Sequence, residues 1–285
     1  MTTLRTARPG DREALYTLWA TCFDAPHVVP LYETDPGRYD RTFVTDDVSA
    51  CVYYLPRRVH DGLGGEVLVG GVANVAAHPS VRGRGHVRRL LALAAEAMTA
   101  DGCAWSLLFT GTPGVYKEWT TFELQTVSGP LRPATPSGPG LRRVAARDAA
   151  VLRDLHERHN ARRPLTAVRD AAHWRERVPV WYGEPVELLA GDAGYAAVRW
   201  DGGVLDVLEV AGDLPQVLAA LAAEAGARRV RSGRARLTWH DPALPSLFSA
   251  VTPERDRTGM ARTLLADPAP VVGAANAAHW PADYF

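Results

Sequence analysis

The sequence is poor in several features that would point to particular classes of protein. Its 3 cysteines in 285 residues are odd in number and widely spaced, which favours buried thiols over a disulfide framework. The formal net charge is +0, so the composition gives no reason to expect nucleic acid or an anionic membrane as a partner. No apolar run reaches the roughly 18 residues of a membrane span, and no secretory leader pattern is found. We therefore expect a cytoplasmic protein that binds neither nucleic acid nor membrane.

Motifs of several common enzyme classes are also missing. There is no G-x-G-x-x-G dinucleotide fingerprint, no Gly-Lys-Ser/Thr of a nucleotide P-loop and no G-x-S-x-G elbow for an acyl-serine route. The 9 histidines are scattered without the spacing of metal ligands, so we expect no metal. The chain is long enough for two globular domains, because 285 residues of 47% hydrophobic composition can form a core in each.

The most informative stretch is residues 70–102. Residues 71–77 are small and apolar, which predicts a buried strand. Residues 78–85 are punctuated by proline and glycine and predict a turn. From Val87 onward the apolar residues recur at the spacing of one helix face, and Gly102 stands where that helix would end. The stretch therefore predicts a strand, a loop and a helix in succession. Before it, residues 49–55 and 65–68 predict two further strands, with a polar connection at residues 57–64.

This arrangement is suited to binding phosphate. The backbone N–H groups of the loop and the partial positive charge of the helix N-terminus attract an anion, and glycine lets the anion approach closely. Four arginines add formal charge at the same end of the helix, namely Arg82, Arg84, Arg88 and Arg89. We predict a phosphate-binding site at this loop.

The spacing Pro79-x-x-Arg82-x-x-Gly85-x-Val87 resembles the R/Q-x-x-G-x-G/A loop with which GNAT acetyltransferases bind the pyrophosphate of an acyl-CoA. Within that superfamily it is most similar to the branch called enhanced intracellular survival (Eis), whose loop reads P-x-x-R-x-R-G-x-L/V and whose chain holds two GNAT repeats. Val87 stands where most GNATs have glycine or alanine. The resemblance implies acetyl-CoA as co-substrate, bound by the strand and loop residues Val75, Ala76, Ala77, Arg82, Gly83, Arg84, Gly85, His86 and Val87.

A second match follows the next predicted strand, residues 104–109. Residues 115–123 resemble the Y-x-x-F-G-[FY]-E segment of Eis-like proteins, although Thr120 replaces the usual glycine and one residue is inserted before Phe122. The resemblance implies that Tyr116 is the general acid that protonates the leaving thiolate. The alternative is a helix-face tyrosine that only packs against the sheet.

Residues 23–41 predict irregular structure, after a first strand at residues 4–8 and a helix that Asp11 caps. In the GNAT layout such a segment borders the acceptor pocket. The resemblance therefore implies acceptor contacts at four residues, Phe23, Asp24, His27 and Tyr32. The alternative for each of them is that its side chain merely covers the core.

The second half of the chain begins with a sequence pattern that repeats the start of the first half. Residues 128–140 are rich in proline and glycine and predict a linker. The leucine and aspartate pattern of residues 141–155 then repeats that of residues 4–18, which indicates a duplication. We predict an α/β fold (α+β, mixed sheet) of two tandem GNAT-type domains, with an N-terminal domain at 1–127, a linker at 128–140, a degenerate domain at 141–267 and a tail at 268–285.

The second repeat lacks the residues of the site. Residues 203–210 predict a strand, residues 215–224 a helix and residues 229–239 another strand. Between the first of these strands and the helix there is no arginine, and Asp213 stands where a phosphate would lie. A carboxylate there would repel the phosphate. We therefore expect one active site per chain.

The tail is too aromatic for a frayed end, so we expect residues 268–285 to dock on the protein. In Eis-like proteins the final carboxylate enters the active site and accepts the proton of the acceptor amine, which implies this role for Phe285. The alternatives are a tail fixed in a surface groove, and Asp283, His27 or Asp24 as the base. The sterol-carrier-like domain that this family normally carries has no counterpart in these 285 residues.

Together these features predict an N-acetyltransferase that moves an acetyl group from acetyl-CoA to a primary amine of a small molecule or a lysine-like acceptor. Two other interpretations stay open, a tandem GNAT of the mycothiol-synthase type and a catalytically silent protein that binds CoA or acts as a scaffold. The sequence does not specify the acceptor. The family likeness favours a homo-oligomer.

Overall fold

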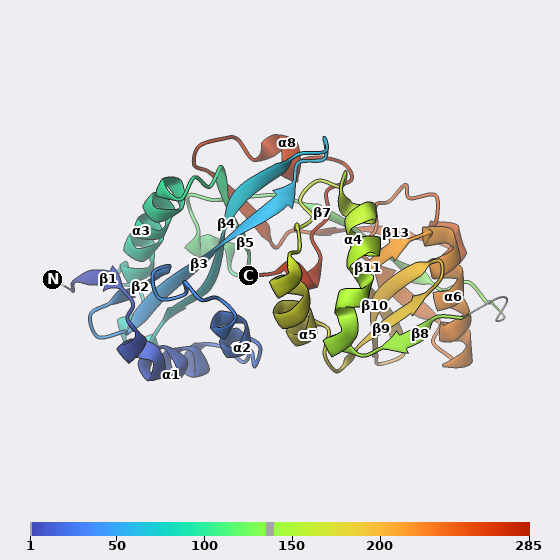
Figure 1. Ribbon diagram of the computed structural model, residues 1–285, viewed down its shortest axis with the longest axis horizontal. Coiled ribbons are helices and arrows are strands. Elements are labelled where there is room, and N and C mark those ends of the chain that lie inside the picture. Colours follow the sequence, from blue (N-terminus) through green and yellow to red (C-terminus); the bar gives the residue numbers. More distant parts are fainter. Residues whose placement is uncertain (1, 135–139) are drawn as a thin grey trace.

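The computed structural model describes residues 2–134 and 140–285, which form two seven-stranded sheets with helices on both faces (Figure 1). The strands of the first sheet lie in the order β1 (Leu4–Thr6), β2 (Thr42–Thr45), β3 (Ala50–His60), β4 (Glu66–Ala77), β5 (Trp105–Phe109), β14 (Gly259–Thr263) and β6 (Thr120–Thr121). The strands of the second sheet lie in the order β8 (Arg142–Val144), β9 (Val186–Gly191), β10 (Gly194–Asp201), β11 (Val204–Gly212), β12 (Ser232–Ala235), β7 (Leu124–Pro130) and β13 (Thr252–Asp256). Both sheets are mixed, because β4 and β5 pair in parallel, as do β11 and β12, among antiparallel neighbours. The predicted fold class is confirmed.

The helices of the first half are α1 (Arg12–Cys22), α2 (Val28–Glu33) and α3 (His86–Ala100). Those of the second half are α4 (Arg153–Asn160), α5 (Val178–Trp181), α6 (Leu214–Ala227), α7 (Leu244–Leu247) and α8 (Ala269–Val272). A π-helical turn, His173–Arg177, precedes α5, and a 3₁₀ turn, Pro281–Asp283, lies near the C-terminus. No helix within these described ranges has the length and apolar character needed to cross a membrane.

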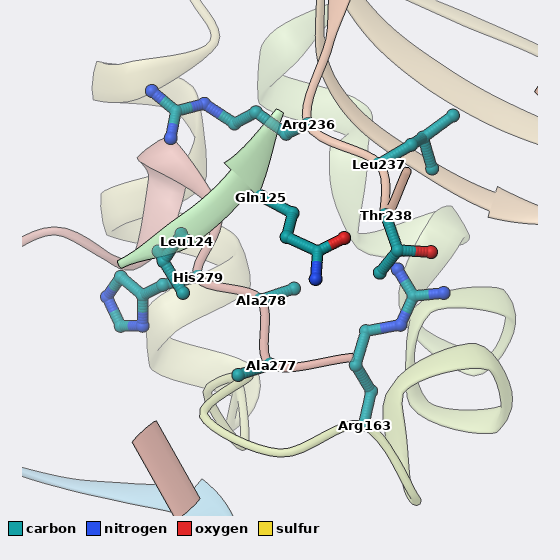
Figure 2. A pocket seen from close by; sticks show the side chains of 9 residues that line it. All are labelled: Leu124, Gln125, Arg163, Arg236, Leu237, Thr238, Ala277, Ala278 and His279. Carbon is teal, nitrogen blue, oxygen red and sulfur yellow. The ribbon is translucent and has the colours of Figure 1, made fainter. Parts of the chain in front are cut away.

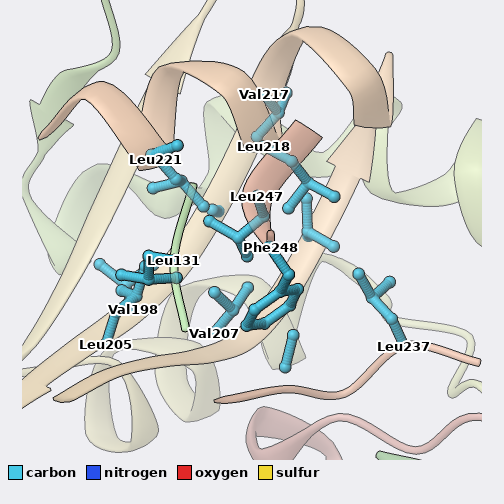
Figure 3. Close-up of a cluster of buried hydrophobic side chains, with 14 of the residues drawn as sticks. Leu131, Val198, Leu205, Val207, Val217, Leu218, Leu221, Leu237, Leu247 and Phe248 are labelled. Carbon is cyan, nitrogen blue, oxygen red and sulfur yellow. The ribbon is translucent and has the colours of Figure 1, made fainter. Parts of the chain in front are cut away.

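Helices cover each sheet with their apolar faces. Helix α1 buries Leu15, Leu18 and Trp19 against the first sheet, and α3 covers the opposite face with residues such as Leu90 and Met98. In the second half, α6 and α7 pack on β10, β11 and β7 through a cluster of leucines, valines and a phenylalanine (Figure 3). Burial of this apolar surface is the main force that holds each half together.

Asp11 precedes α1 as predicted, but its side chain does not cap that helix. The carboxylate instead accepts hydrogen bonds from the Arg5 guanidinium, at 2.7 and 2.9 Å, and from the backbone N–H of Arg8. A charged partner on the neighbouring strand binds this carboxylate more strongly than a neutral backbone donor of the helix would.

Residues 50–77 form one long hairpin in place of the three strands expected from the sequence. Strands are predicted at residues 49–55, 65–68 and 70–77 with a polar connection at 57–64, whereas β3 and β4 are continuous strands that pair from Ala50↔Ala77 to His60↔Glu66. The backbone pairing continues through the two arginines of the predicted connection, of which Arg58 is exposed and Arg57 is half-buried. The end of the hairpin reaches the second half, where Val59 bridges Ala167.

The two halves exchange a strand. Strand β7 follows β6 in sequence but pairs with β12 and β13 of the second sheet, and β14 from the second half inserts between β5 and β6 of the first. The two strand orders match position by position, which supports the predicted duplication.

The exchange corrects the predicted linker and boundaries. Residues 128–130 belong to strand β7 rather than to a linker, and β14 belongs to the first sheet rather than to a unit at 141–267. Residues 135–139 of the predicted linker lie outside the described part of the chain. The predicted strand at 229–239 is shorter, covering only Ser232–Ala235. Residue 129 of this strand has a physical reason to be glycine, because an added Cβ there would lie 2.2 Å from the Ala250 carbonyl oxygen.

The C-terminal tail docks on the protein, as predicted. It lies between the two halves and ends near the centre of the molecule (Figure 1). Trp280 and Ala282 are fully buried, and His279 and Asp283 are nearly so. The Phe285 ring packs on apolar residues of the first sheet.

Candidate active site

A cleft opens where β4 and β5 separate. The two strands pair in parallel only from Val69↔Trp105 to Gly71↔Leu107. Further along β4, a cleft of about 850 Å³ lies between this strand, the start of α3 and the segment after β5. We call it the β4–α3 cleft. Its wall is formed by Cys22, Phe23, Val75, Ala76, Ala77, Val81, Arg82, Gly83, Gly85, His86, Val87, Arg88, Leu91, Ala92, Thr112, Val115, Tyr116, Lys117, Glu118 and Trp119.

The loop at the mouth of the cleft has the conformation that its glycines permit. Gly83 and Gly85 have φ values of 78° and 77°, in the left-handed region that other residues avoid. Gly85 is the N-cap of α3, and no side chain caps that helix. The first turn of α3 contains no acidic residue, so its N–H groups and dipole are free to attract an anion.

Arginine side chains add to this positive region. The Arg82 Nε donates to the Ala77 carbonyl oxygen at 3.1 Å, which ties the loop to the end of β4. Arg82 and Arg88 line the cleft, whereas Arg84 is exposed and does not. Val87, the departure from the usual glycine or alanine, lines the cleft and packs against the core beneath α3.

Strand β4 carries a bulge beside the cleft. Tyr53 pairs with Ala73 and Cys51 with Ala76, so β4 has one residue more than β3 over this interval. Asn74 takes a φ of 49° within the bulge. A bulge turns backbone groups away from the regular ladder, which suits a strand along which a ligand is to lie.

Tyr116 lies on the opposite wall. It follows a 3₁₀ turn, Pro113–Val115, is 9% exposed and packs edge-on against Trp119 with ring centroids 6.2 Å apart. Burial raises the pKa of Tyr116 to about 12, so the hydroxyl stays protonated at neutral pH. Trp119 Nε1 donates to Ser106 Oγ at 3.1 Å, and Ser106 Oγ donates to the Gly70 carbonyl oxygen at 3.1 Å, which joins this wall to β4.

The predicted acceptor residues do not form one group. Phe23 lines the cleft, while Asp24 is exposed beside it and is not part of the wall. His27 packs against Trp181 of the second half, with ring centroids 4.5 Å apart, and burial lowers the pKa of His27.

Tyr32 corrects the prediction for this segment. It is 1% exposed, its hydroxyl bonds to Thr42 Oγ1 at 3.0 Å, and its ring lies in the core with Trp19 and Tyr53. Its segment includes helix α2 rather than being wholly irregular, and α2 turns this tyrosine into the core.

The equivalent position in the second half is occupied by a side chain of the protein itself. Asp213 is the N-cap of α6, and its carboxylate accepts from the Gln216 N–H at 3.2 Å. The carboxylate thus takes the place that an anion would need. This agrees with the expectation of a single site.

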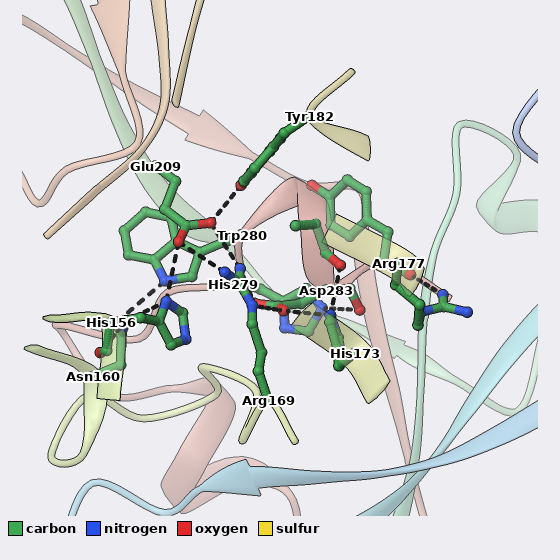
Figure 4. A network of polar contacts seen from close by, with 12 residues as sticks. His156, Asn160, Arg169, His173, Arg177, Tyr182, Glu209, His279, Trp280 and Asp283 are labelled. Carbon is green, nitrogen blue, oxygen red and sulfur yellow. Dashed lines mark hydrogen bonds and ion pairs between the residues drawn. The ribbon is translucent and has the colours of Figure 1, made fainter. Parts of the chain in front are cut away.

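A polar network that the sequence did not predict fixes the tail (Figure 4). The buried Arg169 guanidinium binds Glu209 at 3.0 and 2.7 Å and Asp283 at 2.6 and 3.1 Å. Glu209 also accepts hydrogen bonds from the hydroxyls of Tyr182 and Tyr195. Burial raises the pKa of Glu209, but Arg169 and His156 outweigh it and hold that pKa well below its usual range. No sequence pattern signalled this network, since its members are spread over the second half and the tail.

A second hollow between the halves is too small to hold a substrate. It is lined by Gln125, Arg163, Arg236, Thr238 and the tail residues 277–279, among others (Figure 2). Its volume of about 10 Å³ is close to the space of a single water molecule. The β4–α3 cleft is therefore the better candidate for a substrate site.

The first part of the chain matches a known protein family. Residues 3–120 match the sequence profile of the acetyltransferase (GNAT) domain, so this part of the chain is similar to the domain of a class of acetyl-transferring enzymes. This family uses acetyl-CoA as co-substrate. The matched region contains β4, the glycine loop, α3 and Tyr116.

Solved structures extend the similarity over both halves. A conserved protein of unknown function from Enterococcus faecalis V583, called a probable N-acyltransferase, shares 16% identity with a TM-score of 0.72, over 93% of this chain and 73% of its own. A GCN5-related N-acetyltransferase from Kribbella flavida shares 21% identity with a TM-score of 0.69, over 93% of this chain and 71% of its own. Eis1 from Mycobacterium abscessus shares 15% identity with a TM-score of 0.69, over 93% of this chain and 74% of its own. At these identities the likeness establishes the fold, and comparison with curated proteins gave no significant match.

Proposed function

We propose that the protein is an acetyl-CoA-dependent N-acetyltransferase of the Eis-like tandem kind, which acetylates a primary amine of a small molecule or lysine-like acceptor. The observation that carries the proposal is the β4–α3 cleft, which runs from a positively charged loop at a helix N-terminus to a buried tyrosine. We further propose that the first domain holds the only active site of the chain and that the second supports it.

In this proposal the cleft binds the donor in an extended form. The pyrophosphate lies on the N–H groups of residues 83–87, with Arg82 and Arg88 adding charge. The pantetheine arm lies along Val75–Ala77 as if adding a strand. A backbone N–H at the bulge of β4 then donates to the thioester carbonyl and stabilises the oxyanion, an effect worth about 3 kcal/mol in comparable sites.

The reaction proceeds by direct attack. The neutral amine nitrogen forms a bond to the thioester carbon and gives a tetrahedral intermediate, and the amine proton passes to a base. When the C–S bond breaks, Tyr116 donates its hydroxyl proton to the departing sulfur and regains a proton from solvent. The products are an N-acetyl amine and free CoA. Because burial raises the pKa of Tyr116 to about 12, the hydroxyl carries its proton at the pH at which amines begin to lose theirs.

The base stays a prediction from the resemblance, which assigns it to the carboxylate of Phe285. Two observations support it. The tail is fixed between the halves by the Arg169 ion pairs, and the Phe285 ring packs on β4 at Gly71. Asp283, the alternative base within the tail, is 1% exposed, is paired with Arg169 and does not line the cleft, so we do not assign it this role.

The test is the release of free CoA thiol in the steady state, measured over a panel of primary amines. We expect Tyr116→Phe to lower kcat by about 100-fold, because general acid catalysis contributes roughly 10²–10⁴ in rate, while the affinity for acetyl-CoA changes little. Tyr54→Phe is the matched control, since Tyr54 is buried on the α3 side of the same sheet and does not line the cleft. If acetyl-CoA binds but no amine raises thiol release above hydrolysis, the protein is not the proposed acetyltransferase.

A further inference from the structure

The Phe285 ring occupies a specific place on β4. A Cβ added at Gly71 would lie 2.0 Å from Phe285 Cδ1 and 2.1 Å from Cε1, so the ring rests directly on the backbone of this residue. Gly71 is the last residue of β4 that pairs with β5. The ring therefore covers the point at which the two strands begin to separate.

This point lies in line with the β4–α3 cleft. Val75 is the cleft residue of β4 nearest to Gly71, four residues along the strand, or about 13 Å at a rise of about 3.3 Å per residue. An acyl-CoA whose pyrophosphate is held by the loop at residues 82–85 enters the cleft from the C-terminal end of β4. Its acyl group therefore points back along the strand toward Gly71. A short acyl group ends before the ring, whereas a longer alkyl chain approaches it.

The ring is held in position from several directions. Arg169 binds Asp283 through two hydrogen bonds of 2.6 and 3.1 Å, and Arg177 Nη2 donates to the Tyr284 carbonyl oxygen at 2.8 Å. The ring itself packs between two buried clusters and lies 5.9 Å from the His279 ring. Because hydrogen bonds hold Asp283 and Tyr284, the two residues before Phe285, the ring has little freedom to move aside for a longer acyl chain.

The surroundings of the ring would accept an alkyl chain if the ring were absent. The ring packs against one apolar cluster that includes Val69 and Leu107, from the paired ends of β4 and β5, and against a second that includes Leu55 and Ala73. All four are buried and apolar. Removing the ring leaves an apolar space, and such a space gains from being filled by hydrocarbon.

We propose that the Phe285 ring closes the inner end of the donor site and restricts the enzyme to short-chain acyl-CoA. The ring sets donor specificity by contact with the acyl chain, whichever group serves as the base. This inference rests on the proposed function.

The experiment measures the dissociation constants of acetyl-, butyryl- and hexanoyl-CoA by calorimetry, so that turnover is not required. In the unaltered protein we expect hexanoyl-CoA to bind at least about tenfold more weakly than acetyl-CoA, and Phe285→Ala to remove or reverse that difference. Tyr284→Ala is the matched control, because it disturbs the neighbouring tail residue, whose ring faces Phe109 and Trp181, and leaves the ring at Gly71 in place. It should keep the preference for acetyl-CoA.

Phe285→Leu keeps an apolar anchor for the tail and should give an intermediate ratio, which covers the case in which Phe285→Ala does not fold. Equal binding of acetyl- and hexanoyl-CoA by the unaltered protein, or a ratio unchanged by both Phe285 substitutions, would overturn the inference and leave the proposed function standing. Failure of the unaltered protein to bind any of the three esters would overturn both.

Discussion

Two glycines determine the conformation of the loop at the N-terminal end of α3. Gly83 and Gly85 both adopt positive φ, and an added Cβ at either would meet no atom within 4 Å. The requirement for glycine here is therefore one of backbone conformation and not of space. A residue with a Cβ costs roughly 1–2 kcal/mol in this conformation.

Gly85→Ala should weaken the binding of acetyl-CoA by about tenfold. The altered loop relaxes away from the conformation in which its N–H groups face the pyrophosphate. Returning the loop to that conformation on binding costs about 1–2 kcal/mol. Calorimetry with acetyl-CoA measures the effect. Gly111→Ala is the control, because Gly111 also has free space around it but no positive φ. Equal losses for both variants would show that the conformation of residue 85 does not matter for the donor.

At the scale of elements, the segment from strand to helix was predictable and the polar network around the tail was not. The small apolar residues of β4, the glycine and arginine loop and the amphipathic α3 are local patterns. In contrast, Arg169, Glu209 and Asp283 come together only because the sheet, the segment before α5 and the tail meet in space. Tyr32 was misjudged for a related reason, since its burial depends on how α2 packs on the sheet.

The buried histidines around this network make stability depend on pH. Burial lowers the pKa of His159 to about 4 and lowers the pKa values of His173 and His279, so all three are neutral in the folded protein. Below their ordinary value of 6.5 the unfolded chain takes up protons that the folded protein does not, and the free energy of unfolding therefore falls as the pH falls.

We expect unfolding in urea to show this loss between pH 7 and pH 5, with His159 alone contributing roughly 2 kcal/mol at pH 5. His159→Gln should reduce the dependence on pH, whereas His240→Gln, at an exposed position, should not. A free energy of unfolding that is constant from pH 7 to pH 5 would contradict the assignment of these histidines as buried and neutral.

At the scale of the whole molecule, the exchange of β7 and β14 joins the two halves. Without β14, strands β5 and β6 of the first sheet lose the strand that lies between them. The sequence indicated the duplication but not the exchange, because which of two similar sheets a strand joins depends on long-range pairing. Linker composition was misleading here, since the proline-rich stretch begins inside β7.

A fragment of residues 1–127 should therefore fail to unfold cooperatively, although it contains the whole predicted first domain. Its unpaired strand edges would be exposed to solvent and to other copies. Appending residues 257–266 through a flexible linker supplies β14 and should restore a cooperative transition in thermal unfolding, followed by circular dichroism. A sharp transition for the shorter fragment would show that the exchanged strand is dispensable.

The central claim is that one cleft per chain, between β4 and α3, holds the diphosphate of an acyl-CoA. Titration of the full chain with acetyl-CoA in a calorimeter tests this claim most directly, with Arg82→Ala as the variant and Arg84→Ala as the control outside the cleft wall. The account predicts one acetyl-CoA per chain, bound at least about tenfold more weakly by Arg82→Ala and nearly unchanged by Arg84→Ala. No heat with acetyl-CoA or with CoA, or two equivalents bound per chain, would contradict it.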